Sequence, residues 1–115
     1  MTAAITADDS TPAAPSASGA NRTEIERLQA ALHDLFAPWV RELDLRVDKA
    51  GPGMVELRLP VTPHHVHGGG VLCGQSMMAA ADTAMILAIC TRLGEFKPMT
   101  TVQLQTSFLR PIPGD

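Results

Sequence analysis

A long apolar run in the second half of the chain, residues 77–90, limits the possible folds more than any other feature of this sequence. Only Asp82 and Thr83 break the run, and its alanine and methionine content favours a helix over a strand. The run is shorter than the roughly 20 residues that cross a bilayer. A helix that is apolar on every side has to be surrounded by protein. We therefore expect the rest of the chain to wrap this helix, which Gly94 would end.

Two alternating stretches before this helix predict strands that can cover it. Apolar and polar residues alternate over 43–48 and again over 55–59, with a turn-rich link at 49–53, which predicts an antiparallel hairpin. Residues 101–109 alternate less regularly and are expected to form a third strand. Because the sequence stops at Asp115 just after a Pro-Gly turn signal, we expect a chain that is truncated after this strand.

The beginning of the sequence shows none of the patterns of a folded segment. Residues 1–20 are rich in Ala, Ser, Thr and Pro and contain no Lys or Arg, which a signal or transit peptide would need. We expect a disordered tail over 1–20 and one domain over 21–115. The domain is expected to open with a helix, because Thr23 and Glu26 form a capping box and apolar residues then follow at helical spacing.

Composition excludes several classes of function. A length of 115 residues suits one domain. A net charge of −3 does not favour non-specific binding to the phosphate backbone of a nucleic acid. Aromatic residues make up 3% of the chain and Tyr is absent, which removes the stacking platform for single-stranded nucleic acid. Cys73 and Cys90 are too few for a disulfide scaffold and fit a reducing cytosol. We expect a cytoplasmic domain with neither nucleic-acid nor membrane partners.

Asp82 is the residue that most needs an explanation. On a helix its same-face neighbours are all apolar and include no cation: Met78, Ala79, Met85 and Ile86. A buried, unpaired carboxylate is costly, so it must be partnered from elsewhere, protonated or facing a cavity. Desolvated acids concentrate in active sites. The alternative is a structural Asp that bonds to backbone or reaches solvent at a subunit boundary.

The start of the same helix offers a second chemical group. The residues around Gly74 follow a glycine-rich loop, and the unpaired N–H groups of a helix N-terminus can polarise a carbonyl. A polarised carbonyl and a carboxylate base suit acyl transfer or hydrolysis. Asp82 lies eight residues (82 − 74) beyond Gly74, or about 12 Å along the axis. If the two cooperate, they belong to two subunits related by a two-fold axis.

The order of these features resembles the hotdog-fold acyl-CoA thioesterases, in the phenylacetic-acid-pathway (PaaI-like) branch of the 4-hydroxybenzoyl-CoA thioesterase superfamily. Four stretches carry the resemblance, at residues 67–75, 80–84, 101–102 and 108–111. With the family's acid aligned on Asp82, its first motif glycine falls on Gly74 and an earlier glycine on Gly70. The chain departs from the family pattern at three positions, namely His67, Cys73 and Gln75, which replace an asparagine, a histidine and a glycine.

The resemblance implies an α+β hotdog fold, in which an antiparallel sheet wraps a long central helix. It implies a homodimer or homotetramer with its active site between subunits, and hydrolysis of an aryl- or medium-chain acyl-CoA to free acid and CoA without a cofactor. The N–H of Gly74 would polarise the thioester carbonyl, and Asp82 of the partner subunit would act as base or nucleophile.

The resemblance also assigns supporting roles. Thr101, or Thr100 if the loop is shifted by one residue, would position the water. His67 and Gln75 would donate hydrogen bonds to the carbonyl or thioester. Four residues are expected to bind the substrate, with the last of them near a CoA phosphate: Gly70, Cys73, Thr100 and Arg110.

Other interpretations of these residues stay open. Zinc is suggested by the ligand types at His64, His65, His67 and Cys73, but their spacing matches no standard zinc pattern, so we expect no metal. Cys73 at a helix start could be a nucleophile with His67, or simply a small packed residue. Four methionines either line an acyl tunnel or pack the core: Met77, Met78, Met85 and Met99. A hotdog domain that only binds acyl-CoA or assembles is the alternative function, and a hydratase is a weaker third.

Overall fold

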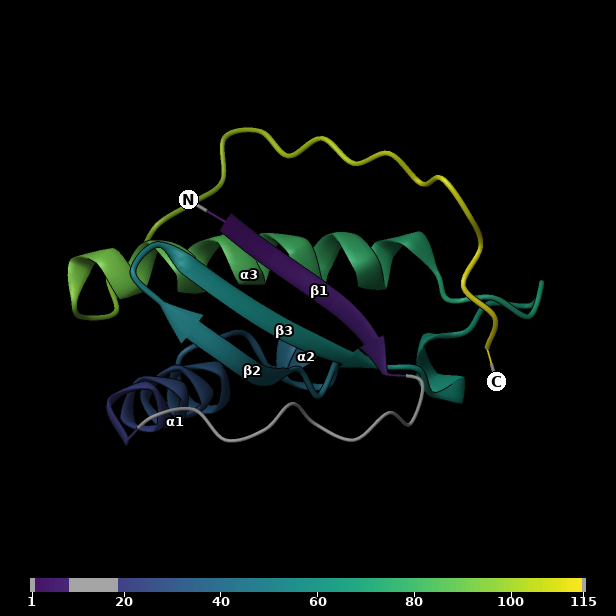
Figure 1. Ribbon diagram of the computed structural model, residues 1–115. Helices are drawn as coiled ribbons and strands as arrows, with labels where there is room; N and C mark the ends of the chain where they lie inside the picture. The colour runs from purple at the N-terminus through teal and green to yellow at the C-terminus, as the bar shows by residue number, and fades with distance from the viewer. Residues whose placement is uncertain (1, 9–18, 115) are drawn as a thin grey trace.

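The computed structural model describes residues 2–8 and 19–114. They form an α+β arrangement of one sheet, one long helix along it and shorter helices (Figure 1). The sheet has the strand order β1-β3-β2. The elements follow in the order β1 (Thr2–Asp8), α1 (Gly19–Asp34), α2 (Pro38–Arg41), β2 (Arg46–Gly51), β3 (Met54–Pro60), η1 (Pro63–His65) and α3 (Gly74–Leu93).

The predicted antiparallel hairpin is confirmed by β2 and β3. Val47 pairs with Leu57 and Ala50 with Val55, with a register irregularity between Val47 and Lys49. The alternation of β3 appears as burial, because its apolar residues are enclosed while the residues between them are partly exposed. Leu57 is fully buried at the centre of this strand. The apolar face of the hairpin therefore forms one side of the hydrophobic core.

The predicted long helix is confirmed by α3, which contacts all three strands. Gly94 ends it in the left-handed region with φ 77°, and its N–H donates to the Cys90 carbonyl at 3.0 Å. Within one copy of the chain, protein does not surround the helix on every side, because Met78 and Met85 are 36% and 39% exposed. The three strands cover one side of α3 and leave the methionine side open.

The N-terminal prediction needs a correction. Residues 2–8 were expected to lie in a disordered tail, but they form β1, which runs parallel to β3 (Figure 1). The backbone supplies the reason, since β3 has an edge of unpaired N–H and C=O groups that any extended segment can pair with. Helix α1 begins at Gly19, before the predicted capping box of Thr23 and Glu26. Residues 9–18 lie outside the described residues, so the tail remains a prediction there.

The prediction of a third strand over 101–109 is wrong as well. These residues adopt no regular secondary structure and follow α3 back toward its start (Figure 1). A strand exists only by pairing with a neighbour, and none of the described strands lies beside this segment. The sheet is also not wholly antiparallel, because β1 is parallel to β3.

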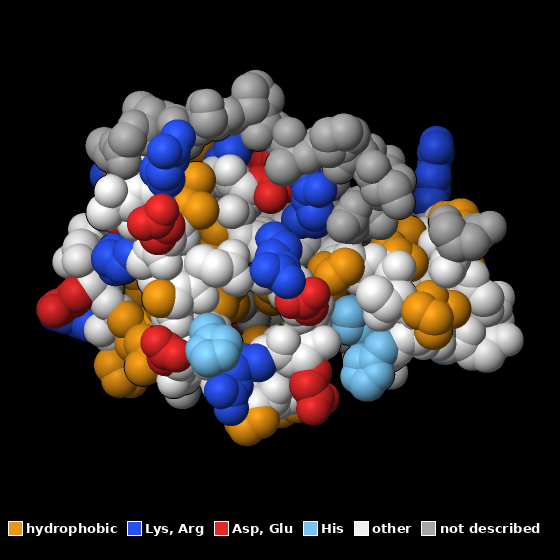
Figure 2. Space-filling view, turned by 90° about the horizontal axis from the view of Figure 1, so that it is seen from below, with side chains coloured by type: hydrophobic (Ala, Val, Ile, Leu, Met, Phe, Trp, Pro, Cys, Tyr) orange, Lys and Arg blue, Asp and Glu red, His pale blue; other side chains and the backbone are white. Residues whose placement is uncertain are grey.

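The length and composition of α3 bear on whether this helix could span a membrane. At 20 residues it is longer than the apolar run expected from the sequence, and by length and composition alone it could cross a membrane. The core helix of a soluble protein passes the same test. Across the face shown in Figure 2, side chains of Lys and Arg are interspersed with those of Asp and Glu.

Candidate functional site

The centre of the candidate site is a hydrogen bond between Asp82 and Thr101. Asp82 lies in the middle of α3 and is half-buried. Thr101, from the segment that follows the helix, donates its hydroxyl hydrogen to Oδ1 of the Asp82 carboxylate. The sequence leaves Asp82 without a partner on its own helix, and the fold supplies one from a later segment. Thr101 is the one hydrogen-bond partner that Asp82 has in the part of the chain that the structure describes.

An apolar pocket of about 340 Å³ lies beside this pair, between α3 and the segment that follows it. Thr101 is part of its wall, so the carboxylate–hydroxyl pair lies at its rim. Of the four methionines considered for an acyl tunnel, two line this pocket and two do not. The lining residues are Met85, Ile86, Ile89, Met99, Thr100, Thr101, Val102 and Gln103.

The N-terminus of α3 holds Cys73 as its N-cap residue. Its Sγ lies 3.0 Å from Oγ of Ser76, and its N–H donates to the His65 carbonyl at 2.9 Å. The pKa of the Cys73 thiol is lowered, chiefly by the hydrogen bond from Ser76 and also by the backbone N–H groups at the helix start, while desolvation opposes the shift. The helix start therefore stabilises a negative charge at the sulfur atom.

Gly74 lies under the ring of Phe108. A Cβ atom at Gly74 would come within 3.3 Å of the Phe108 Cζ atom, so the glycine permits this close approach. Phe108 itself remains 52% exposed, because it lies on the surface of α3 with no covering layer on its outer side. Within one chain, the segment that follows α3 thus contacts both ends of the candidate site, through Thr101 at Asp82 and through Phe108 at Gly74.

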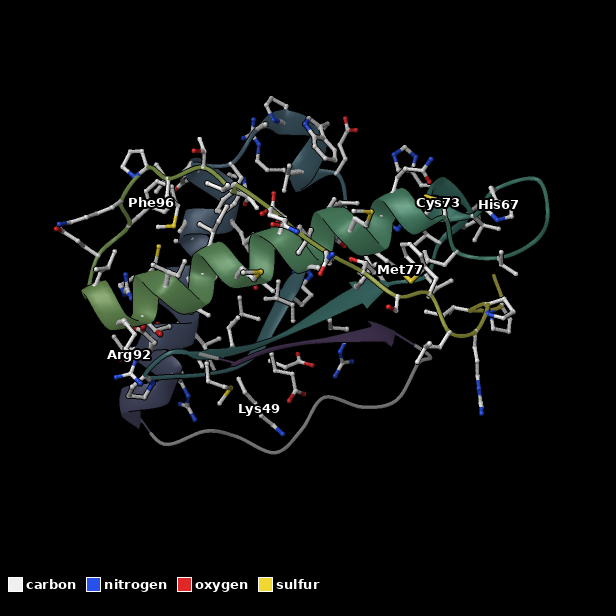
Figure 3. The ribbon with its side chains drawn as sticks, turned by 90° about the horizontal axis from the view of Figure 1, so that it is seen from above. Lys49, His67, Cys73, Met77, Arg92 and Phe96 are labelled. Carbon is white, nitrogen blue, oxygen red and sulfur yellow. The ribbon has the colours of Figure 1, made fainter. Side chains whose placement is uncertain are left out.

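His67 and Gly70 belong to a tight loop beyond the start of α3 (Figure 3). Nδ1 of His67 accepts the Gly69 N–H at 2.8 Å, and the carbonyl of His67 accepts the Gly70 N–H at 2.9 Å. Gly70 has φ 79° and accepts the Gly114 N–H at 3.0 Å. The structure therefore places His67 in a solvent-exposed turn and does not bring it to Asp82.

The remaining predicted residues lie apart from one another. Gln75 is exposed on the first turn of α3, where it lines a second pocket of about 220 Å³. Thr100 lines the pocket beside Asp82. Arg110 is exposed after the extended segment and forms no ion pair with another described residue. Within one copy of the chain, and among the described residues, Asp82 and Thr101 are the only two members of the predicted set whose side chains hydrogen-bond to each other.

The second pocket is lined by His65, which the sequence suggested only as a zinc ligand, and by Ser76, to which the sequence analysis gave no role. His65 is only 4% exposed, and its Nδ1 lies 3.0 Å from the Pro60 carbonyl. Because a carbonyl can only accept, Nδ1 carries the proton, and Nε2 is left as a buried acceptor with no hydrogen-bond partner among the described residues. Three similar histidines in one loop give no signal that this one is buried. Cys73 and Ser76 do not form a capping box, which needs Ser or Thr at the N-cap and Glu or Gln three residues later, so the sequence pattern gives no signal for Ser76 either.

The chemistry available here is that of a carboxylate with a hydroxyl donor beside an apolar pocket, and of a helix N-terminus that favours negative charge. The described residues contain no group of three or more His, Cys, Asp and Glu side chains placed to hold a metal ion. Comparison with protein-family models, with curated proteins and with solved structures finds no match for this chain.

Proposed function

We propose that this chain is an acyl-CoA thioesterase of the hotdog type, in the PaaI-like branch suggested by its motif order. The observation that carries the proposal is the Thr101–Asp82 hydrogen bond at the rim of an apolar pocket. A carboxylate with an oriented hydroxyl next to an apolar cavity suits attack on an acyl group. The substrate would be an aryl- or medium-chain acyl-CoA, and the products the free acid and CoA.

Asp82 would take a proton from water as the water oxygen attacks the thioester carbon, or would attack that carbon itself. In the first route the C–S bond breaks, the proton passes to the leaving CoA thiolate, and no cofactor is needed. In the second route the carboxylate displaces the CoA thiolate and forms an acyl–aspartate anhydride, which water then hydrolyses to the free acid and the restored carboxylate, with one water proton going to the thiolate. Thr101 would orient the carboxylate in both routes. The oxygen of the carbonyl becomes negative as the bond forms, which the Gly74 N–H at a helix start would stabilise.

The spacing of Gly74 and Asp82 supports a site shared between two copies. Both lie on α3, about 12 Å apart along its axis, so one thioester cannot reach both groups of one helix. The carbonyl would be polarised by Gly74 of one copy and attacked with the help of the partner's Asp82. The proposal therefore includes a homodimer, or a dimer of dimers, working in the cytoplasm, where the free thiols of Cys73 and Cys90 would persist.

Thiol release from a panel of acyl-CoAs tests this function, with Asp82→Asn compared with the unchanged chain at matched oligomeric state. We expect the rate to fall at least a hundredfold in Asp82→Asn, because the amide can neither accept the proton nor attack. Asp34→Asn is the matched control, since Asp34 is an exposed aspartate on α1. Equal rates in Asp82→Asn and the unchanged chain would remove Asp82 from catalysis.

A second candidate function is binding of acyl-CoA, or assembly, without turnover. The position of Phe108 favours it, because the ring lies over Gly74 and restricts access to the helix start within one copy. A chain that binds a non-hydrolysable acyl-CoA analogue in calorimetry, yet releases no thiol from any member of the panel, would establish this second function.

A further inference from the structure

The second pocket, of about 220 Å³, lies between α2, η1 and the first turn of α3. It shares no lining residue with the pocket beside Asp82. Trp39 belongs to α2 and Glu42 is its C-cap, while His65 ends η1 and Ser76 lies in the first turn of α3. Elements that are remote in sequence therefore meet at one concave surface, as they do in sites for small molecules.

The buried imidazole of His65 leaves one polar atom in the wall of this pocket unsatisfied. Its Nδ1 donates to the Pro60 carbonyl, so its Nε2 is an acceptor. Among the described residues, Nε2 is the one buried side-chain nitrogen or oxygen that has no hydrogen-bond partner. A buried acceptor without a donor is unfavourable and calls for an explanation. A ligand that carries an N–H or O–H donor would remove this cost.

Access to Nε2 depends on the side chains at the rim of the pocket. The Nε2 atom has almost no accessible surface of its own, although the ring lines the pocket. Trp39 is 60% exposed, and Gln75 is exposed on the first turn of α3. Exposed side chains change rotamer within nanoseconds. A small movement of one of them gives a ligand a path to Nε2.

The charge of the pocket favours a cation. Glu42 supplies a carboxylate, and there is no Lys or Arg among the described residues that line the pocket. Oε2 of Glu42 lies 4.0 Å from Nε2 of His64, and the two side chains are 67% and 69% exposed. An ion pair so exposed is weak, so a ligand can replace it. The N–H groups of Gln75 and Ser76 offer no anion site here, because they are directed at the Cys73 sulfur atom.

Trp39 adds an aromatic face to these acceptors. Most of its large side chain is in contact with water, although burial would be favourable. Indole is the aromatic side chain that attracts cations most strongly. Leu43, which is 5% exposed, provides an apolar surface in the same pocket. The lining thus combines an aromatic face and an apolar surface with a carboxylate and a ring nitrogen that accepts.

We propose that this pocket binds a small organic cation, an ammonium group carried on an apolar or aromatic body. The N–H donors of the ammonium would bond to the Glu42 carboxylate and to Nε2 of His65. The body would lie against Trp39 and Leu43. A volume of about 220 Å³ is that of about seven water molecules, which suits a ligand of the size of benzylamine. The proposal does not rest on the proposed hydrolysis, because Asp82 has no part in it.

The fluorescence of Trp39 tests this proposal without reference to activity. Trp39 is the one tryptophan of the chain and tyrosine is absent, so the intrinsic fluorescence reports on this pocket. Benzylamine is the probe, benzyl alcohol its neutral analogue and benzoate its anionic analogue. At about pH 8 benzylamine is cationic and an ordinary imidazole is neutral. We expect a saturable change with a dissociation constant of about 1 mM for benzylamine, and at least tenfold weaker binding of both analogues.

Substitutions locate the binding. Glu42→Gln removes the charge at constant shape and should raise the dissociation constant for benzylamine at least fivefold. His65→Asn keeps a donor for the Pro60 carbonyl and lacks the second ring nitrogen, so it should raise the constant at least threefold. Glu26→Gln is the matched control, an exposed glutamate on α1 whose substitution should change nothing. Far-UV circular dichroism checks that each variant folds, and Glu42→Gln decides alone if His65→Asn does not.

Three results would overturn the proposal. One is a fluorescence change that grows linearly with benzylamine and never saturates, because it would be collisional. Another is equal affinity for benzylamine and benzyl alcohol, and the third is equal affinity of Glu42→Gln and Glu26→Gln for benzylamine. Asp82→Asn should bind benzylamine as the unchanged chain does. Loss of thiol release in that variant bears on the proposed function alone, so the two proposals fail independently.

Discussion

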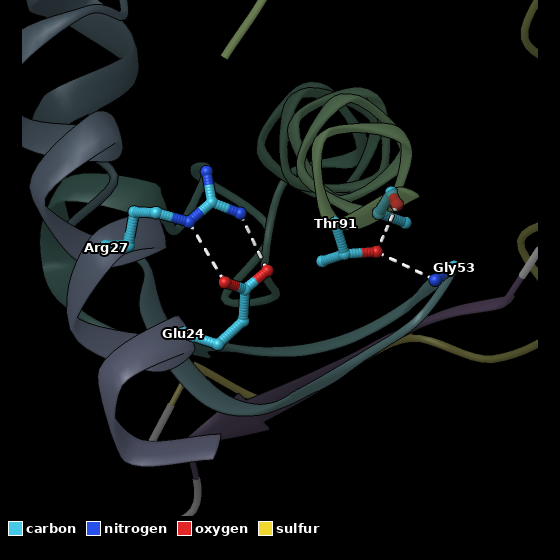
Figure 4. Close-up of polar contacts among 5 residues, drawn as sticks. Glu24, Arg27, Gly53 and Thr91 are labelled. Carbon is cyan, nitrogen blue, oxygen red and sulfur yellow. Dashed lines mark hydrogen bonds and ion pairs between the residues drawn. The ribbon is translucent and has the colours of Figure 1, made fainter. Parts of the chain in front are cut away.

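Thr91 connects the hairpin turn to the end of α3, and its hydroxyl carries a measurable share of the fold's stability. Its Oγ1 accepts the Gly53 N–H at 2.7 Å and donates to the Ala88 carbonyl at 2.6 Å (Figure 4). Gly53 lies in the turn between β2 and β3, is buried and has φ 69°. Thr91→Val keeps the branched shape of the side chain and removes the oxygen, so the buried Gly53 N–H loses its acceptor.

The size of the effect follows from the unsatisfied amide. An orphaned buried donor costs about 1–3 kcal/mol, and the Ala88 carbonyl keeps its place in the helix, so we expect the free energy of unfolding to fall by about 2 kcal/mol. With a urea m-value of about 2 kcal/mol/M, the unfolding midpoint would fall by about 1 M. Far-UV circular dichroism during urea titration measures this shift.

Thr91→Ser is the matched control because it keeps the oxygen and loses only a methyl group. Its midpoint should stay within about half of the shift seen for Thr91→Val. Equal losses in the two variants would show that the methyl group, and not the hydroxyl, supports the turn. An unchanged midpoint in Thr91→Val would refute the claim that this hydrogen bond ties the hairpin to α3.

Two further predictions concern the site. Hydrogen bonds at the helix start lower the pKa of the Cys73 thiol, so the rate of its alkylation by iodoacetamide should rise with pH at a midpoint below the ordinary thiol pKa of about 8.5. Ser76→Ala should move that midpoint upward. An unmoved midpoint would rule out Ser76 as the main cause of the lowered pKa. If the chain hydrolyses thioesters, Thr101→Val should lower kcat/KM about tenfold, because the variant loses a hydrogen bond to a charged group. Thr101→Ser keeps the hydroxyl and should retain most of kcat/KM. A larger loss in Thr101→Ser than in Thr101→Val would show that the hydroxyl has no part in the reaction.

The hairpin and α3 could be predicted because their sequence patterns are local. The alternation over β3 assigns its inward residues directly, and Leu57 is buried as that pattern requires. The apolar run and Gly94 together predict where α3 lies and where it ends. In both cases the signal is contained within one element, so no knowledge of distant contacts is needed.

The two errors in strand assignment have one cause. β1 contains a single large apolar residue, Ile5, and no alternation, yet it is a strand because β3 offers an unpaired edge. Residues 101–109 have the alternation but pair with none of the described strands, and they remain irregular. Strand formation depends on a partner that is remote in sequence, and a pattern within the segment does not reveal whether the partner exists.

The candidate site was predictable in part for a similar reason. Asp82 stands out because it is an acid within an apolar helix, and Thr101 was expected near it only through the resemblance to the thioesterases. The buried state of His65 and the approach of Phe108 to Gly74 depend on how the loop before α3 and the segment after it pack. Neither contact has a spacing signal, because the residues involved are joined by the fold and not by a local pattern.

The geometry of α3 carries a prediction about assembly that rests on the proposed function. The helix separates Gly74 from Asp82 by about 12 Å, so the proposed hydrolysis would need a second copy to bring the two groups together. If the chain hydrolyses thioesters in this way, dilution below the dimer dissociation constant should abolish turnover in proportion to the dimer lost. Turnover per chain that stays constant on dilution into the monomer range would contradict the shared site.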